Sequence, residues 1–212
     1  MNAFVLAGGL SSRMGRDKAL LAWHGRPLIE IALEKLRQIG FSPAILGSRP
    51  DLERFAPVIP DNVAQQGPLG AVEAALSATD AEFNLFLSVD MPLLPVGLLR
   101  WLVARAEMTQ AVATMPRIEG RPQPLCAVYH RRLLAGVRAS LAQGDLKLVR
   151  AVEGAVRDLG ELADTFDVEA IDSALRGSEG WPMEVPVRLW FQNVNTPQDF
   201  DRLTLEQTAC IR

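Results

Sequence analysis

The fold of this chain is decided by the stretch FVLAGGLSSRMGRDK, residues 4–18. Its apolar start, Phe4 to Leu6, predicts a short strand that is buried on both faces, and two glycines then end that strand. A loop follows that carries hydroxyl groups and three cations, Arg13, Arg16 and Lys18. Glycines let a backbone approach a ligand closely, and successive N–H groups can hold phosphate oxygens. The segment therefore predicts a phosphate-binding loop, although an ordinary glycine turn with solvated basic residues would also fit, and its spacing matches neither the Walker A loop nor G-x-G-x-x-G.

Beyond this stretch, short aliphatic runs alternate along the chain with segments whose apolar residues have helical spacing. We expect further strands at 44–46, 58–59, 84–89, 111–115, 125–129 and 187–191, and helices at 27–39, 67–78, 96–107, 131–142 and after Thr196. This order predicts an α/β fold with a mostly parallel, three-layer α/β/α Rossmann-like sheet, whose ligands lie at the carboxyl ends of the strands. We expect one domain over residues 1–212, in which the stretch 146–186 is hard to assign because glycines and prolines interrupt its second half.

Composition excludes several classes of protein. The chain has 212 residues, a formal net charge of -3 and a sequence pI near 5.5, which argues against nucleic acid as a partner because nucleic-acid binders present a basic surface. Its apolar runs are too short to span a membrane, and its first residues lack the basic lead of a signal peptide. Two cysteines make no disulfide framework. We therefore expect a cytoplasmic protein with no membrane partner.

Four polar residues outside the first loop are candidate ligands. Asp90 directly follows the clearest strand, where a carboxylate suits Mg²⁺, although Asp before Met-Pro is also a common turn. Asp61 follows the strand at 58–59, and Asp-Asn is likewise an ordinary turn pair. Asn193 and Asn195 are two residues apart after the last expected strand, so both amides would lie on one face. Thr196 next to them would also serve as a helix N-cap, so both readings stay open.

Several motifs of this sequence resemble those of a known family. The run LAGGLSSRMGRDKALL is similar to the signature of the MobA-like nucleotidyltransferases, in particular the molybdenum cofactor guanylyltransferases. The resemblance extends, in the family's order, up to about Gly144 and resumes at Asn193. The first motif is highly specific to the family. The other motifs are weak individually and strong in combination; they are residues 67–70 (GPLG), 88–92 (SVDMP), 123–129 (QPLCAVY) and 193–197 (NVNTP).

The resemblance implies a nucleotide-diphospho-sugar transferase type of fold and an Mg-dependent guanylyltransferase. GMP would pass from GTP to the terminal phosphate of molybdopterin, releasing pyrophosphate and forming molybdopterin guanine dinucleotide. The implied roles are catalysis by Arg13, Lys18 and Asp90, with Asp90 as the Mg²⁺ ligand, and substrate binding by Leu6, Ala7, Gly8, Gly9, Lys18, Asp61, Asp90, Asn193 and Asn195. The two asparagines would lie beside molybdopterin and the metal. The resemblance leaves room for contacts with other proteins of cofactor biosynthesis, and it leaves the oligomeric state open.

GTP is expected over CTP because cytidylyl relatives tend to have Ala at the position of Gly8, and glycine there leaves room for a purine edge. Two departures from the family pattern stand out. A family asparagine is replaced by Gly47, and residues 146–186 carry a probable insertion in the region that should enclose the second substrate. Two alternatives therefore stay open: a related cytidylyl- or sugar-phosphate nucleotidyltransferase, and a catalytically inactive nucleotide-binding accessory protein.

Overall fold

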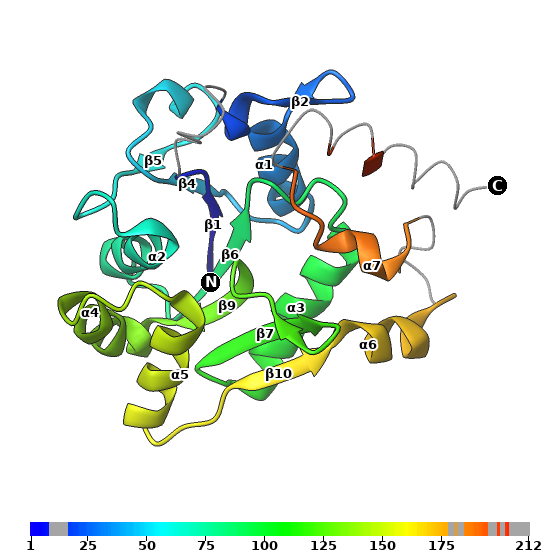
Figure 1. Cartoon of the computed structure of the whole chain (residues 1–212). Coiled ribbons are helices and arrows are strands. Elements are labelled where there is room, and N and C mark those ends of the chain that lie inside the picture. Colours follow the sequence, from blue (N-terminus) through cyan, green and yellow to red (C-terminus); the bar gives the residue numbers. More distant parts are fainter. Residues whose placement is uncertain (9–16, 178–180, 182–184, 195–198, 200–201, 204–212) are drawn as a thin grey trace.

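The structure, a computed structural model, describes residues 1–8, 17–177, 181, 185–194, 199 and 202–203. Within these residues the chain forms an eight-stranded mixed sheet in the order β10-β7-β9-β6-β1-β4-β5, with β8 paired to β7 (Figure 1). The strands are β1 (Asn2–Leu6), β4 (Ala44–Leu46), β5 (Val58–Ile59), β6 (Phe83–Ser88), β7 (Ala113–Ile118), β8 (Arg121–Pro122), β9 (Cys126–His130) and β10 (Asp164–Asp167). A separate small hairpin joins β2 (Ala22–Trp23) to β3 (Arg26–Pro27).

The sheet is mostly parallel, as the alternation of elements predicted. β1 runs parallel to both β4 and β6, β4 runs parallel to β5, and β10 runs parallel to β7. Antiparallel pairing is confined to β9, which lies between β6 and β7, and to the short β8. The four parallel strands β1, β4, β5 and β6 therefore end at one edge of the sheet, and the loops that follow them meet there.

Helices cover both faces of the sheet and complete three layers (Figure 1). One face carries α1 (Leu28–Gln38) and α3 (Val96–Thr109), and the other carries α2 (Gly67–Ala78), α4 (Leu134–Ala142) and α5 (Leu148–Asp158). Two shorter helices, α6 (Val168–Leu175) and α7 (Val187–Trp190), extend the first layer. Three 3₁₀ turns connect these elements: η1 (Lys18–Leu20), η2 (Pro50–Leu52) and η3 (Arg131–Leu133).

Two aliphatic cores explain why these segments fold as they do. The side chains of β1 alternate between them, with Val5 facing α1 and α3 while Phe4 and Leu6 face α2. Every residue of β6 is buried, as expected for a central strand covered on both faces. On the second face, α4 and α5 cross closely because Gly136 has no side chain; a Cβ there would lie 2.4 Å from the Cβ of Ala155.

The expectation of a strand at 187–191 is wrong, because this segment forms helix α7. Pro186 immediately precedes the helix with φ -58°, and Leu189 and Trp190 are buried, with the Trp190 indole N–H donating to the Val185 carbonyl at 2.8 Å. A short apolar run with no clear period fits a strand or a buried helical turn equally well, so tertiary packing decides between them. The asparagines at 193 and 195 accordingly do not follow a strand.

Strand β10 was not expected, because three of its four residues are polar. It lies at the sheet edge and is anchored there by Arg105, which bonds both carboxylate oxygens of Asp164 at 2.7 and 2.8 Å and lies over the ring of Phe166. Residues 117–123, between the strands expected at 111–115 and 125–129, also form regular structure. Glu119 and Gly120 have φ of 49° and 71°, which forms a tight hairpin turn and lets β7 and β8 pair.

The other elements expected before residue 143 are confirmed to within a few residues, including the strands at 44–46 and 58–59 and the helix at 67–78. The helix expected after Thr196 falls largely outside the described residues. The helix at 131–142 consists of η3 followed by α4. The N-cap expected at Thr196 lies outside the described residues. Among the described residues, no helix combines the length and the apolar character needed to cross a membrane. The single domain over 1–212 and the insertion around 146–186 stay predictions.

Candidate functional site

A cavity of about 690 Å³ lies at the carboxyl ends of the four parallel strands. Each of these strands delivers residues to it through the loop that follows, and the first turn of α2 closes one side. This is the edge where an open parallel sheet binds its ligands. The lining residues are Leu6, Ala7, Gly8, Lys18, Ser48, Arg49, Asp61, Ala64, Gln65, Gly67, Pro68, Ala71, Ser88, Val89, Asp90 and Leu125.

Most of the described site residues predicted from sequence meet in this cavity. Leu6, Ala7, Gly8, Lys18, Asp61 and Asp90 all line it, although they come from three separate segments, at and after the ends of β1, β5 and β6. Asn193 is exposed and does not line the cavity. Gly9, Arg13 and Asn195 lie outside the described residues, so their placement stays a prediction.

The loops after β1 and β4 touch backbone to backbone. Ala7 donates its N–H to the Leu46 carbonyl at 3.1 Å, and a Cβ on Gly47 would lie 2.9 Å from the Cα of Gly8. Gly47 also has φ 122°, a conformation that side chains rarely adopt. The glycine that departs from the family pattern is therefore required by the local fold of this chain.

Lys18 and Asp90 form the charged centre of the cavity. The Lys18 ammonium lies 3.4 Å from Asp90 Oδ2, and the Ser88 hydroxyl donates to Asp90 Oδ1 at 2.6 Å. Asp90 is buried, and the main-chain N–H of Val194 donates to its carbonyl oxygen at 2.9 Å. This last contact brings the segment that carries Asn193 beside the Asp90 loop, so the prediction that the two are neighbours is supported by the backbone path.

Asp61 brings a second carboxylate to the same cavity. Its Oδ1 is buried and has no hydrogen-bond partner in the described part of the chain, and burial raises the pKa of the carboxyl group. A buried carboxylate oxygen without a partner is costly. The cavity therefore offers a position for a cation or an N–H donor at Asp61.

Arg49 is a member of this site that sequence reasoning missed. Its guanidinium bonds both oxygens of Asp17 and, at 2.9 and 2.7 Å, both oxygens of Asp51. The hydrogen bonds that Arg49 donates to these carboxylates, the one to Asp51 first, raise the pKa of Arg49 despite its burial. Asp17 also accepts the Ala19 N–H at 3.0 Å and so caps the turn that carries Lys18. An arginine two residues before an aspartate, Arg49 and Asp51, was the only available signal, and this pattern is common on surfaces.

The acidic side chains of the cavity bear on whether Mg²⁺ can bind there. Among the described residues, no group of three or more His, Cys, Asp or Glu side chains has metal-binding geometry. Mg²⁺ in phosphate-binding sites needs only one or two carboxylates, and the substrate phosphates and waters complete its shell. Asp90, with the unpartnered Oδ1 of Asp61 in the same cavity, fits this smaller requirement.

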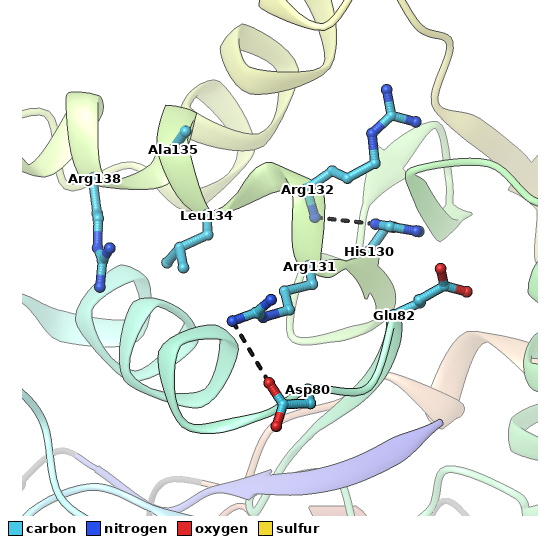
Figure 2. A pocket seen from close by; sticks show the side chains of 8 residues that line it. All are labelled: Asp80, Glu82, His130, Arg131, Arg132, Leu134, Ala135 and Arg138. Atoms are coloured by element: carbon cyan, nitrogen blue, oxygen red, sulfur yellow. Dashed lines mark hydrogen bonds and ion pairs between the residues drawn. The ribbon is translucent and has the colours of Figure 1, made fainter.

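A second cavity, of about 760 Å³, lies at the opposite edge of the sheet, between the C-terminal end of α2 and η3 (Figure 2). It is lined by Asp80, Glu82, His130, Arg131, Arg132, Leu134, Ala135 and Arg138. Each of its arginines is paired with a carboxylate: Arg131 with Asp80 at 3.9 Å, Arg132 with Glu161 at 2.8 Å and Arg138 with Glu73 at 2.8 Å. Its positive charge is therefore balanced locally by carboxylates.

Comparison with known proteins places this geometry in context. Residues 3–158 match the family model described as the MobA-like NTP transferase domain. A molybdenum cofactor guanylyltransferase of Xanthomonas euvesicatoria is 37% identical over 204 residues, covering 95% of this chain and 93% of the relative. A probable molybdenum cofactor guanylyltransferase of Bacillus licheniformis is 31% identical over 208 residues, covering 94% of each chain.

Solved structures show the same fold at lower sequence identity. Molybdopterin-guanine dinucleotide biosynthesis protein A of Archaeoglobus fulgidus superposes with a TM-score of 0.76 at 24% identity, covering 99% of this chain and all of the other. The 2-C-methyl-D-erythritol 4-phosphate cytidylyltransferase of Thermus thermophilus superposes with a TM-score of 0.62 at 16% identity, covering 97% of this chain and 98% of the other. Because named guanylyl and cytidylyl proteins share the architecture, the fold alone does not identify the nucleotide.

Proposed function

The chain belongs to the family of MobA-like NTP transferases, and on this basis we propose that it is an Mg-dependent guanylyltransferase of molybdenum cofactor biosynthesis. It would transfer GMP from GTP to the terminal phosphate of molybdopterin, release pyrophosphate and form molybdopterin guanine dinucleotide. Relatives with that printed name align over nearly the whole chain, which supports this acceptor over others. We place the reaction in the cytoplasm and in a single domain spanning residues 1–212.

The observation that carries the proposal is the convergence of Lys18 and Asp90 in the cavity at the strand ends. A cation and a carboxylate in contact neutralise each other. A nucleoside triphosphate with its divalent ion would supply each with a different partner, phosphate for Lys18 and metal for Asp90. If Asp61 served only to stabilise the fold, its buried carboxylate oxygen should have a hydrogen-bond partner, and among the described residues it has none.

The reaction asks the protein for alignment and charge neutralisation more than for covalent chemistry. A phosphate oxygen of the acceptor attacks the α-phosphorus of GTP, a new P–O bond forms, and the bond to pyrophosphate breaks. Lys18 would stabilise the negative charge that grows on the departing pyrophosphate, together with Arg13 from the signature loop. Bound Mg²⁺ would supply Lewis-acid neutralisation of the phosphates, held by Asp90 with Asp61 nearby.

The nucleotide is expected between the loops after β1 and β4 and the start of α2. The backbones of Leu6, Ala7, Gly8 and Gly9 would lie along it, and glycine at position 8 leaves space for a purine edge. Asn193, on the segment whose Val194 contacts the Asp90 loop, and Asn195 would contact molybdopterin from the other side. Donor and acceptor would then lie on opposite sides of Asp90.

Calorimetry of GTP, CTP and ATP binding with Mg²⁺, followed by pyrophosphate release with added molybdopterin, tests the proposal. Of the three nucleotides, we expect only GTP to bind tightly. Pyrophosphate should be released only when molybdopterin is present. Asp90→Ala should abolish turnover, whereas Asp80→Ala, at a fully exposed aspartate in the second cavity, should not change it. Preference for CTP would indicate the cytidylyl alternative, and turnover unaffected by Asp90→Ala would remove the enzyme assignment.

A further inference from the structure

The turn that follows Asp90 is buried along its whole length. Residues Val89 to Leu94 are all classed as buried, although they form a connection between β6 and α3 rather than a regular element. A buried connection must find hydrogen-bond donors for its carbonyl groups inside the protein. Within the turn, the N–H of Leu94 donates to the Met91 carbonyl at 3.3 Å. The other carbonyl groups of the turn need hydrogen-bond donors from other parts of the protein.

Lys35, on helix α1, supplies those donors. Its ammonium donates to the Met91 carbonyl at 3.0 Å and to the Pro92 carbonyl at 2.6 Å. The residue is only 9% exposed, and within the described part of the chain these two carbonyls are its hydrogen-bond partners. The nearest titratable group that influences it is the thiol of Cys126 on β9.

Burying a lysine without a carboxylate partner destabilises the folded state. Burial disfavours the charged form and lowers the pKa of Lys35 to about 7. An apolar side chain of similar length would avoid that cost but would leave the carbonyls of Met91 and Pro92 without these donors. The two bonds show where the ammonium acts: on the two residues directly after Asp90.

The Asp90 loop is held from three directions. Ser88 fixes the carboxylate, Val194 fixes the main-chain carbonyl of Asp90, and Lys35 fixes the following turn. We infer that Lys35 is a positioning residue that holds the loop at residues 90–92 in the geometry in which Asp90 can bind a divalent cation. Lys35 is not among the described residues that line the cavity, so we place its influence in the turn that it contacts.

The test compares Lys35→Met, which keeps the apolar stem and removes the ammonium, with Lys35→Gln, which keeps a neutral donor. Lys147→Met, at an exposed lysine that precedes α5, is the matched control. Native-state hydrogen exchange of the peptide covering residues 88–94 reports the loop directly. Titration with Mn²⁺ alone, followed by its electron paramagnetic resonance, reports the affinity for a divalent cation without any turnover.

For Lys35→Met we expect exchange in the 88–94 peptide to accelerate by about tenfold or more, because two charge-assisted hydrogen bonds are lost. Mn²⁺ affinity should fall on the order of tenfold, as it does when outer partners of metal ligands are removed. Near pH 7 the melting temperature should stay the same or rise, and Lys35→Gln should restore part of both losses. A merely structural lysine would lower the melting temperature and accelerate exchange equally in β6, α3 and the loop.

The inference rests on the proposed function only through the cation at Asp90. Unchanged loop exchange and unchanged Mn²⁺ affinity in a folded Lys35→Met protein would overturn it, whatever the enzyme transfers. If wild-type protein binds no Mn²⁺ at all, the metal role of Asp90 and the inference both fail. If it binds Mn²⁺ with the expected response to Lys35→Met but transfers no GMP, the inference stands and the proposed reaction fails.

Discussion

Gly8 and Gly47 face each other across the loops that follow β1 and β4, and only one of them has room for a methyl group. A Cβ on Gly8 would meet the Cα of Gly47 at 3.6 Å, which is an ordinary contact. A Cβ on Gly47 would meet the Cα of Gly8 at 2.9 Å, with φ 122° adding strain. A change at Gly8 therefore tests ligand binding with little effect on the fold, whereas a change at Gly47 would disturb both.

We predict that Gly8→Ala lowers kcat/KM for GTP by about tenfold, because a methyl group enters the space expected for the purine and a single methyl-sized change in a pocket has an effect of this order. CTP use should fall less. The measurement is pyrophosphate release with each nucleotide. Gly154→Ala, in α5 with nothing within 4 Å of its Cβ, is the control. Equal GTP kinetics in Gly8→Ala and wild-type protein would count against the position of the base.

At the scale of elements, Arg49 joins η1, which carries Lys18, to the loop after β4. It bonds two carboxylates through one planar guanidinium, a geometry that lysine does not reproduce. We predict that Arg49→Lys accelerates hydrogen exchange in residues 17–21 and lowers kcat/KM for GTP by about tenfold, as expected for the loss of a charge-assisted bond. The expected cause is a less well-held Lys18.

The control for this change is Arg117→Lys. Arg117 also bonds both oxygens of an aspartate, Asp167, at 3.1 and 3.2 Å, but both side chains are largely solvated. Exposed ion pairs contribute little. If the two substitutions alter GTP kinetics equally, Arg49 has no special role in placing Lys18.

Helix α2 is tied to the Asp61 loop through Glu73. This buried carboxylate accepts from Asn62 at 2.7 Å and from Arg138 at 2.8 Å, and Ser77 donates to it at 2.9 Å. Burial alone would raise the pKa of Glu73, but the hydrogen bonds from Asn62, Arg138 and Ser77 outweigh it and leave the pKa lowered. Because the pKa of Glu73 is lower in the folded chain than in the unfolded chain, its charge stabilises the fold at any pH above its pKa in the unfolded chain. This stabilisation is lost as the pH falls through the pKa of Glu73 in the folded chain.

We predict that Glu73→Gln lowers the free energy of unfolding by about 1–3 kcal/mol near pH 7, since charge-assisted bonds to a buried group are lost. The difference from wild type should shrink as the pH approaches about 4, where the unfolded carboxyl becomes protonated. Urea unfolding at both pH values measures it. Glu161→Gln removes an exposed partner of Arg132 and should have little effect at either pH. A constant difference across this range would show that the charge is not responsible.

On the scale of the whole molecule, the buried Lys35 links stability to pH. Its pKa of about 7 in the folded chain lies below its value in the unfolded chain, so the unfolded chain holds more protons between these two values. Raising the pH in this window therefore favours the folded state. Among the described residues, the Cys126 thiol is the titratable group that influences Lys35; burial raises its pKa to about 12, so it stays neutral between pH 7 and pH 10.

We predict that the free energy of unfolding of metal-free wild-type protein rises relative to Lys35→Met between about pH 7 and pH 10, by at most about 1.4 kcal/mol per pH unit. Below about pH 6.5 the two curves should run parallel, because Lys35 is then protonated in both states. Urea unfolding of both proteins at several pH values gives the comparison. Parallel curves over the entire range would mean that Lys35 keeps its ordinary pKa when buried.

The sequence alone was sufficient for the positions of the central strands along the chain. The aliphatic runs of β1, β4 and β6 alternate with helical spacing along the chain, and local periodicity is what such segments express directly. It was also sufficient to place Lys18, Asp61 and Asp90 together, because each follows or lies beyond a parallel strand and such strand ends meet at one edge. The segments at the periphery were harder: α7 and β10 were missed because packing, rather than periodicity, selects their conformation.

The tertiary structure decided how the site is held. Neither Arg49 nor Lys35 belongs to a motif, and each contacts residues that are distant in sequence: Arg49 reaches Asp17, and Lys35 reaches Met91 and Pro92. Their partners are set by which buried polar groups remain unsatisfied once the layers pack, and this depends on three-dimensional proximity rather than on local pattern. Local sequence therefore determined which residues can do the chemistry, and packing determined which residues keep them in place.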